Sequence, residues 1–253
     1  MHYQIDLNSD MGESFGAYKL GNDAEIIQYV TSANIACGWH AGDPMVMDRT
    51  VKAAAARGVA VGAHPGYPDL MGFGRRKMTL SPLETKNYVK YQIGALWAFA
   101  KSEGLKLQHV APHGSLGNLC QYDRETSRAI CEAVYEIDPS IIIYYCAGAV
   151  LGEEAKKLGL TAKSEIFADR AYIDDLSLVP RSMPGAMIMD ENIAIARCIR
   201  MVKEGKVTSL NGKELDIRGD TLCVHGDGAK ALAFVEKIRA AFTAEGIEIR
   251  NFQ

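Results

Sequence analysis

The chain has 253 residues, of which 48% are hydrophobic and 23% are charged, and its net charge is −3. This composition is typical of a soluble globular protein with a substantial core, and it excludes disordered, collagen-like and coiled-coil classes. The 28 basic residues do not outnumber the 31 acidic ones, so no basic surplus indicates a nucleic-acid partner.

Short strand-like runs alternate with helical patterns along the whole chain, as in proteins built around a parallel sheet. The predicted strands are Tyr3–Leu7, Ala33–Ala36, Val59–Ala63, Leu107–Ala111, Ile141–Tyr145, Leu160–Phe167 and Thr221–Val224. A doubly wound open sheet usually has a glycine-rich phosphate turn after its first strand, and none is present here. The pattern therefore predicts a TIM-like, seven-stranded β/α barrel that forms a single domain over residues 1–253.

Helices are predicted between the strands from their start signals. Asp43 opens one helix, and the capping box that begins at Ser81 opens a longer one that ends at Gly104. In the longer helix Trp97 belongs to an apolar set with helical spacing, so we expect it in the core. Further helices are expected after Asp123, Ala149, Asp190 and Ala229. An Asn-Gly turn predicts a β-hairpin excursion over residues 207–217.

The N-terminus lacks the features of a secretory signal, and no apolar run approaches the ~20 residues that span a bilayer. We therefore expect a cytoplasmic protein without membrane contact. The six cysteines include no Cys-x-x-Cys pair, so we expect reduced thiols, mostly in the core. The sequence also has no P-loop, Rossmann fingerprint or nucleophile elbow, so nothing indicates a nucleotide site.

Polar residues gather at the carboxyl ends of the predicted strands, and four of the six histidines lie there. In a parallel barrel these ends converge on one face, where active sites are built. Glu13 follows the first strand on this face. The residues that we predict to be catalytic are Asp10, His40, His64, His113, Glu165, His225 and Asp227.

A mixed set of histidines and carboxylates suits Zn, Mn or Fe better than Mg or Ca. The predicted ligands are Asp10, His40 and His64. Because the chain has no His-Glu-x-x-His motif, this metal prediction depends on the geometry of the fold. An equally weighted alternative is a metal-free cluster in which histidines and carboxylates transfer protons.

Two long connections, residues 65–76 and 169–185, are expected to reach the same face, and loops of this length commonly bind ligands. They carry Arg75, Arg76, Arg170 and Arg181. A guanidinium group pairs with carboxylates or phosphates through two hydrogen bonds, so we predict a small anionic substrate. The predicted substrate-binding residues are these four arginines together with Asn8 and Asp169. The alternative for each arginine is a solvated surface side chain.

Several blocks of the sequence closely resemble the LamB/YcsF family. They are DLNSDMGESFG (6–16), SANIACGWHAGDP (32–44), GAHPGYPD (62–69), GFGRR (72–76), FADRAY (167–172), VPRS (179–182) and CVHGD (223–227), in order over nearly the whole chain. The resemblance implies a seven-stranded β/α barrel like that of polysaccharide deacetylases. It also implies ATP-dependent opening of the lactam ring of 5-oxoproline to glutamate, with partner subunits B and C.

One block departs from the family. Residues 111–118 read APHGSLGN, where members usually read KPHGALYN, so a lysine and a tyrosine are absent from the rim. Two alternatives stay open. The fold relationship to deacetylases suggests a metal-dependent amide hydrolase that acts on another substrate, such as an N-acetylated sugar, and the altered block suggests a catalytically silent binding subunit. Because the chain has no phosphate-binding loop, we expect the partner subunits, and not this chain, to bind ATP.

Overall fold

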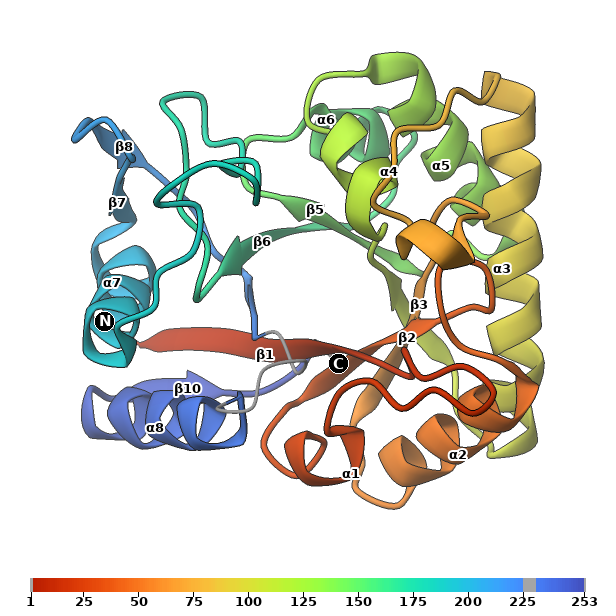
Figure 1. Ribbon diagram of the computed structural model, residues 1–253, viewed down its shortest axis with the longest axis horizontal. Helices are drawn as coiled ribbons and strands as arrows, with labels where there is room; N and C mark the ends of the chain where they lie inside the picture. Colours follow the sequence, from red (N-terminus) through yellow and green to blue (C-terminus); the bar gives the residue numbers. More distant parts are fainter. Residues whose placement is uncertain (1, 225–230, 253) are drawn as a thin grey trace.

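Seven parallel strands close into a barrel in the computed structural model, which describes residues 2–224 and 231–252 (Figure 1). The strands are β1 (Tyr3–Met11), β2 (Ser32–Ala36), β3 (Ala60–His64), β4 (Leu107–Val110), β5 (Ile142–Cys146), β6 (Ala162–Phe167) and β9 (Thr221–Cys223). They pair in this order, and β9 pairs with β1 to close the ring. The predicted TIM-like, seven-stranded barrel is confirmed.

Strand β1 is longer than predicted and has two neighbours on the same side. Its first residues pair with β10 (Ile247–Ile249), whereas Asp6–Asn8 pair with β9. The three-residue β10 was not predicted, because so short a run has no recognisable alternation. Two further strands, β7 (Lys206–Thr208) and β8 (Glu214–Asp216), form an antiparallel pair at the upper left of Figure 1.

Helices surround the strands on the outside (Figure 1). They are α1 (Asp23–Ile26), α2 (Pro44–Ala55), the short 3-10 helix η1 (Leu70–Gly72), α3 (Pro82–Ser102), α4 (Gly114–Leu119), α5 (Arg124–Ile137), α6 (Val150–Lys157), α7 (Glu191–Glu204) and α8 (Ala231–Ala244). The Asp43 carboxylate accepts hydrogen bonds from the first turn of α2, and Ser81 forms the predicted capping box of α3. Among the described residues, no helix is both long enough and apolar enough to cross a membrane.

The prediction that Trp97 lies in the core is wrong. Its side chain is on the outer side of α3, and 47% of the residue is exposed. The buried stripe of α3 includes Val89, Ile93, Leu96 and Ala100. Trp97 follows Leu96 by one residue, which turns its side chain about 100° around the helix and away from the stripe. All six cysteines are free thiols, and five of them are buried, as expected.

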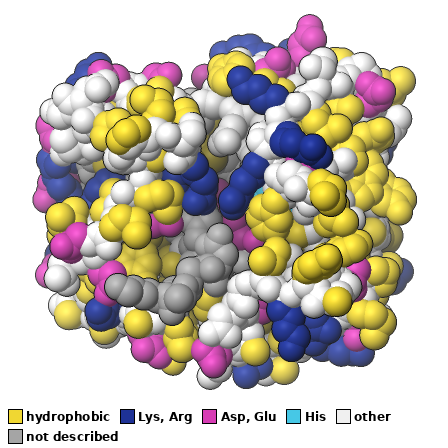
Figure 2. Space-filling view, viewed as in Figure 1, with side chains coloured by type: hydrophobic (Ala, Val, Ile, Leu, Met, Phe, Trp, Pro, Cys, Tyr) yellow, Lys and Arg dark blue, Asp and Glu magenta, His cyan; other side chains and the backbone are white. Residues whose placement is uncertain are grey.

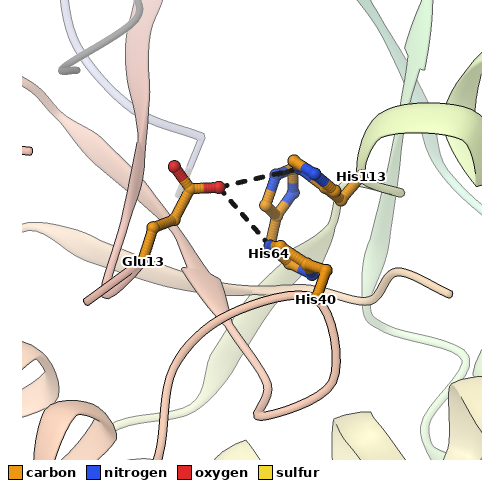
Figure 3. A group of neighbouring side chains, drawn as sticks. All are labelled: Glu13, His40, His64 and His113. Atoms are coloured by element: carbon orange, nitrogen blue, oxygen red, sulfur yellow. Dashed lines mark hydrogen bonds and ion pairs between the residues drawn. The ribbon is translucent and has the colours of Figure 1, made fainter. Parts of the chain in front are cut away.

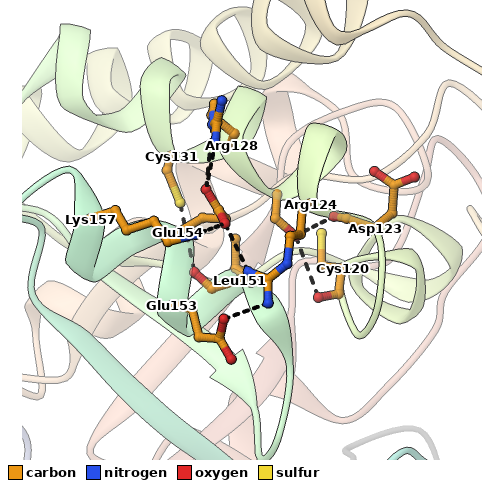
Figure 4. Close-up of polar contacts among 10 residues, drawn as sticks. Cys120, Asp123, Arg124, Arg128, Cys131, Leu151, Glu153, Glu154 and Lys157 are labelled. Carbon is orange, nitrogen blue, oxygen red and sulfur yellow. Dashed lines mark hydrogen bonds and ion pairs between the residues drawn. The ribbon is translucent and has the colours of Figure 1, made fainter.

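Ion pairs to one buried carboxylate join α5 to α6 (Figure 4). The side chain of Glu154 is only 1% exposed, and it accepts hydrogen bonds from Arg124 Nη1 at 3.0 Å and Lys157 Nζ at 2.6 Å. Arg128 Nη2 lies 3.4 Å from the same carboxylate. These partners, Lys157 foremost, lower the pKa of Glu154, so the carboxylate stays ionised although it is buried. We interpret this cluster as structural.

The interior of the barrel is polar near its closing seam, where β9 pairs with β1. The fully buried carboxylate of Asp6 on β1 accepts hydrogen bonds from Ser32 on β2 at 2.6 Å, Thr221 on β9 at 2.6 Å and Tyr144 on β5 at 3.1 Å. Thr31 adds a fourth hydroxyl donor at 2.7 Å. Because Tyr144 comes from a strand that does not neighbour β1, the side chain of Asp6 points into the barrel. Burial raises the pKa of Asp6, and the four hydroxyl groups oppose that shift.

We expect Tyr144→Phe to lower the free energy of unfolding by about 1–2 kcal/mol, because it removes one hydrogen bond to a buried carboxylate and keeps the ring. Urea unfolding of the two proteins measures the difference. The phenyl ring can still stack on His109, whose ring lies 4.0 Å from that of Tyr144 at an angle of 4°. Equal stability of the two proteins would show that the hydroxyl group adds nothing to the seam.

Candidate functional site

Three histidines and one glutamate converge at the carboxyl end of the barrel (Figure 3). Glu13 follows β1, His40 follows β2, His64 is the last residue of β3, and His113 follows β4. One potential ligand atom from each of the four lies within 4.8 Å of the others. Glu13 Oε1 is 3.4 Å from His40 Nε2 and 3.7 Å from His113 Nδ1. We call these four residues the rim cluster.

Two of the histidines are oriented by backbone carbonyl groups. His64 Nδ1 lies 2.6 Å from the carbonyl oxygen of Ala111, and His113 Nε2 lies 2.8 Å from that of Phe73. A carbonyl oxygen only accepts hydrogen bonds, so these two nitrogens carry the protons. The other nitrogen of each ring faces the cluster, and the two are 2.9 Å apart. Histidines that bind metals are commonly held in this way.

His40 is buried completely between other rings and stacks on His113 with centroids 3.7 Å apart. Within the described part of the chain, neither nitrogen of His40 makes a hydrogen bond. Buried polar atoms in proteins nearly always have a partner, so the donor set of the rim cluster fits a ligand that these atoms bind. A divalent metal ion is the ligand that suits three imidazoles and a carboxylate.

The three histidines differ in their charge. Burial lowers the pKa of His40 well below its usual range and lowers the pKa of His113 to about 3. The nearby charge of His64 lowers both pKa values further. Burial also opposes charging of His64, but the Asp10 carboxylate, 3.4 Å from its Nε2, raises the pKa to about 9. His40 and His113 are therefore neutral near pH 7, which is the form that binds metals. Metal binding to His64 would release its proton.

The loop after β3 packs against the rim cluster. Gly74 has a φ of +62°, and a Cβ there would lie 2.7 Å from His40 Cβ and 2.9 Å from His113 Cδ2. A side chain at this position would therefore displace both rings. Asp69 holds the loop together by accepting hydrogen bonds from the guanidinium group of Arg76 and from the backbone of Gly72. Arg76, which the sequence assigns to substrate binding, is thus engaged within the chain.

The other predicted arginines lie near the mouth of the barrel. Arg170 is only 7% exposed; its Nη2 donates to the carbonyl oxygen of Val179 at 2.7 Å, and its Nε has no hydrogen-bond partner among the described residues. Burial, with the nearby charges of Arg181 and Arg75, lowers the pKa of Arg170. Arg75 is exposed and lies over the ring of Phe73, 4.9 Å from its centroid. Figure 2 shows Lys and Arg side chains around a hollow in which a small area of histidine is visible.

The remaining predicted site residues fall into four groups. Asp10 lies next to His64 but is not one of the four in the rim cluster. Asn8 and Glu165 are buried in β1 and β6, and Asn8 is engaged with Thr221 at 2.6 Å inside the barrel. Asp169 precedes Arg170 in the loop after β6. His225 and Asp227 lie outside the described residues.

Glu13 is a site residue that was not selected from the sequence. The sequence places Glu13 after the first predicted strand, which is where site residues are expected. Asp10 lies in the same region and was chosen as the predicted ligand instead. The structure places Glu13 in the rim cluster because β1 continues to Met11 and Gly12 then turns the chain with a φ of +68°. Two interior residues that were not selected either, Asn34 and His109, connect to Asp10 by hydrogen bonds.

The block that departs from the family pattern lies beside the rim cluster. Ala111 is buried, and its carbonyl oxygen accepts the hydrogen bond of His64. Gly117 is in α4 and packs against the backbone of Pro112; a Cβ at 117 would lie 2.4 Å from the carbonyl oxygen of Pro112. With this backbone, no larger side chain fits at 117.

Comparisons with known proteins show which family the chain is similar to. A family model described as LamB/YcsF matches residues 5–253. The chain is similar to the 5-oxoprolinase A subunit of Alkaliphilus metalliredigens, with 57% identity over 247 residues that cover 98% of this chain and 96% of the relative. The corresponding protein of Bacillus subtilis is 54% identical, with 98% and 96% covered. A crystal structure of a lactam utilization protein from Thermus thermophilus has a TM-score of 0.93 at 51% identity, with 98% and 100% covered.

Proposed function

Because the chain belongs to the LamB/YcsF family, as its sequence blocks predicted, we propose that it acts as the A subunit of a 5-oxoprolinase. In this role it opens the lactam ring of 5-oxoproline to L-glutamate, in a reaction coupled to ATP hydrolysis and carried out with subunits B and C. The relatives with this name match the chain over nearly its full length. The single observation that supports catalysis by this chain is the rim cluster, with its buried imidazoles beside Asp10.

A five-membered lactam resists hydrolysis, which explains the need for ATP. We propose that the lactam oxygen is phosphorylated at a site in the partner subunits and that the activated ring reacts at the rim cluster. Water adds to the ring carbonyl carbon while Asp10 accepts a proton from it. The carbon–nitrogen bond then breaks, and the nitrogen takes up that proton. A second water hydrolyses the resulting acyl phosphate to glutamate and phosphate.

The donors of the rim cluster fit a divalent metal ion, and Glu13, His40, His64 and His113 are the residues that would hold it. Such an ion would supply positive charge that stabilises negative charge on the reacting oxygen. The carbonyl groups of Ala111 and Phe73 keep the rings of His64 and His113 turned toward the cluster. Asp10 remains beside them as the base.

The carboxylate of 5-oxoproline requires a cationic partner, and Arg170 is the strongest candidate. Its guanidinium group is buried, and its Nε has no hydrogen-bond partner in the described part of the chain. A substrate carboxylate would satisfy that donor and the positive charge together. Arg75 and Arg181 lie close enough to affect the pKa of Arg170 and extend the positive field at the mouth of the barrel.

One incubation series tests the proposal against its alternatives. The purified chain is mixed with 5-oxoproline and ATP, with and without subunits B and C, and separately with N-acetylated sugars. We expect glutamate only when all three subunits and ATP are present. Acetate release from the sugars by the chain alone would instead show a deacetylase. Glutamate formation by subunits B and C alone would show that this chain is catalytically silent.

We expect the isolated chain not to bind ATP, because its sequence contains no P-loop motif. Calorimetric titration of the purified chain with ATP and Mg²⁺ is the measurement. No heat of binding is expected at micromolar to millimolar ATP. A dissociation constant in the micromolar range would contradict the assignment of ATP to the partner subunits.

A further inference from the structure

We infer that His109, inside the barrel and away from the mouth, is a positioning residue that holds Asp10 against the rim cluster through Asn34. This inference rests on the proposed function for the role of Asp10 and for the metal site at the rim cluster. His109 on β4 donates to Asn34 on β2, with 2.7 Å between His109 Nε2 and Asn34 Oδ1. Asn34 Nδ2 in turn donates to Asp10 Oδ1 on β1 at 2.9 Å. Asp10 Oδ1 lies 3.4 Å from His64 Nε2.

The direction of each hydrogen bond follows from the chemistry of the groups. An ionised carboxylate only accepts, so the amide nitrogen of Asn34 must face Asp10, and its oxygen must face His109. The same nitrogen also donates to Asn8 Oδ1 at 2.8 Å, so all three hydrogen bonds of Asn34 agree with one orientation. His109 must therefore carry its proton on Nε2. Burial lowers the pKa of His109 to about 3, so the ring is neutral and supplies this single N–H group.

The barrel is shaped to keep His109 in place. His109 and Asn34 are both buried, with relative exposures of 0% and 1%. The imidazole stacks on the ring of Tyr144, and β3 has a glycine at the position that faces it. A Cβ on Gly62 would lie 2.1 Å from His109 Nε2, so any other residue at 62 would displace the ring. His109 Nδ1 has no hydrogen-bond partner among the described residues, so within that part of the chain the ring is tied to its neighbours by the Nε2–H group alone.

Loss of this N–H group has a definite consequence for the rim. The buried oxygen of Asn34 would have no donor. The amide would then be held only at its nitrogen, by Asp10 and Asn8, and its orientation would no longer be fixed. Asp10 would lose its fixed position next to His64, which belongs to the rim cluster. Replacing outer-shell residues that orient the groups around a metal typically changes metal affinity or activity by about 10–100-fold.

The experiment measures the affinity of the full-length chain for Zn²⁺ alone, by competition with a chromogenic chelator. For His109→Leu, which removes the donor, we expect the dissociation constant to rise about 10–100-fold. His109→Gln restores an N–H donor and should recover most of the affinity. In an Asn34→Ala background, His109→Leu should cause no additional loss, because the effect of His109 passes through Asn34. In the assembled enzyme, kcat should fall more for His109→Leu than for His109→Gln, and KM should not change for either variant.

Tyr144→Phe is the matched control, because it keeps the ring against His109 and removes only the hydroxyl group that serves Asp6. Its Zn²⁺ affinity should equal that of the wild type although its stability is lower. Melting temperatures separate a folding defect from a loss of positioning. Equal Zn²⁺ affinity of wild type and His109→Leu overturns the inference, and so does an additional loss in the Asn34→Ala background. A wild-type chain that binds no Zn²⁺ contradicts the metal centre. In that case the role of His109 is tested by kcat, and it is overturned if His109→Leu and the wild type have the same kcat.

Discussion

The His64→Ala protein is expected to lose its bound divalent metal and to lose activity in the assembled enzyme by at least about 100-fold. His64 supplies an imidazole nitrogen at the centre of the rim cluster and is the residue that Asp10 approaches. Its removal leaves three potential ligands and takes away the partner of His113. Elemental analysis of protein purified without chelator should find near-stoichiometric Zn, Mn or Fe in the wild type and little in the variant.

His2→Ala is the matched control for this experiment. His2 is highly exposed and pairs with Glu248 near the chain end, so its removal should change neither metal content nor activity. His64→Ala should still fold, because the barrel is stabilised mainly by its apolar core, and its circular dichroism spectrum should match that of the wild type. Wild-type protein that is free of metal and fully active would rule out the metal centre.

Arg170→Lys is expected to lower kcat/KM for 5-oxoproline. Expressed as an activation free energy, the expected loss is about 2–4 kcal/mol. Lysine keeps the positive charge but cannot form two parallel hydrogen bonds with a carboxylate. Turnover of 5-oxoproline by the assembled enzyme measures the effect. Arg57→Lys is the control, because Arg57 is an exposed residue that follows α2 and should tolerate the same change.

A second substrate shows whether Arg170 recognises the carboxylate. 2-Pyrrolidinone has the same lactam ring without the carboxylate, so Arg170→Lys should affect its turnover little. The variant should therefore discriminate less than the wild type between the two lactams. Equal losses on both substrates would mean that Arg170 supports the shape of the loop after β6 and does not bind the substrate anion.

The sequence predicted the barrel and the convergence of His40, His64 and His113, because strand ends and helix caps are local signals. The end of β1 was misplaced for a physical reason. Asn8 and Asp10 resemble loop residues, whereas in the structure they extend the strand and point into a polar barrel interior. An interior lined by polar side chains does not show the apolar pattern from which strands are recognised.

Contacts between side chains could not be predicted from the sequence. Arg76 was predicted to bind the substrate because a guanidinium group suits an anion, and in the structure its side chain donates to Asp69 in the same loop. His109 looked like an ordinary strand residue, since its role depends on Asn34, which is 75 positions away in the chain. Gly62 was uninformative in the sequence, and its purpose becomes visible only when the ring of His109 is seen to occupy the space beside it.

The central claim is that ring opening takes place at the rim cluster of this chain and not in its partners. The most direct measurement is the rate of glutamate formation from 5-oxoproline and ATP by the enzyme assembled with subunits B and C, in which this chain is either wild type or His113→Ala. The account predicts normal assembly and at least about a 100-fold lower rate of glutamate formation with the variant. An unchanged rate of glutamate formation would place the chemistry in the partner subunits and contradict the account.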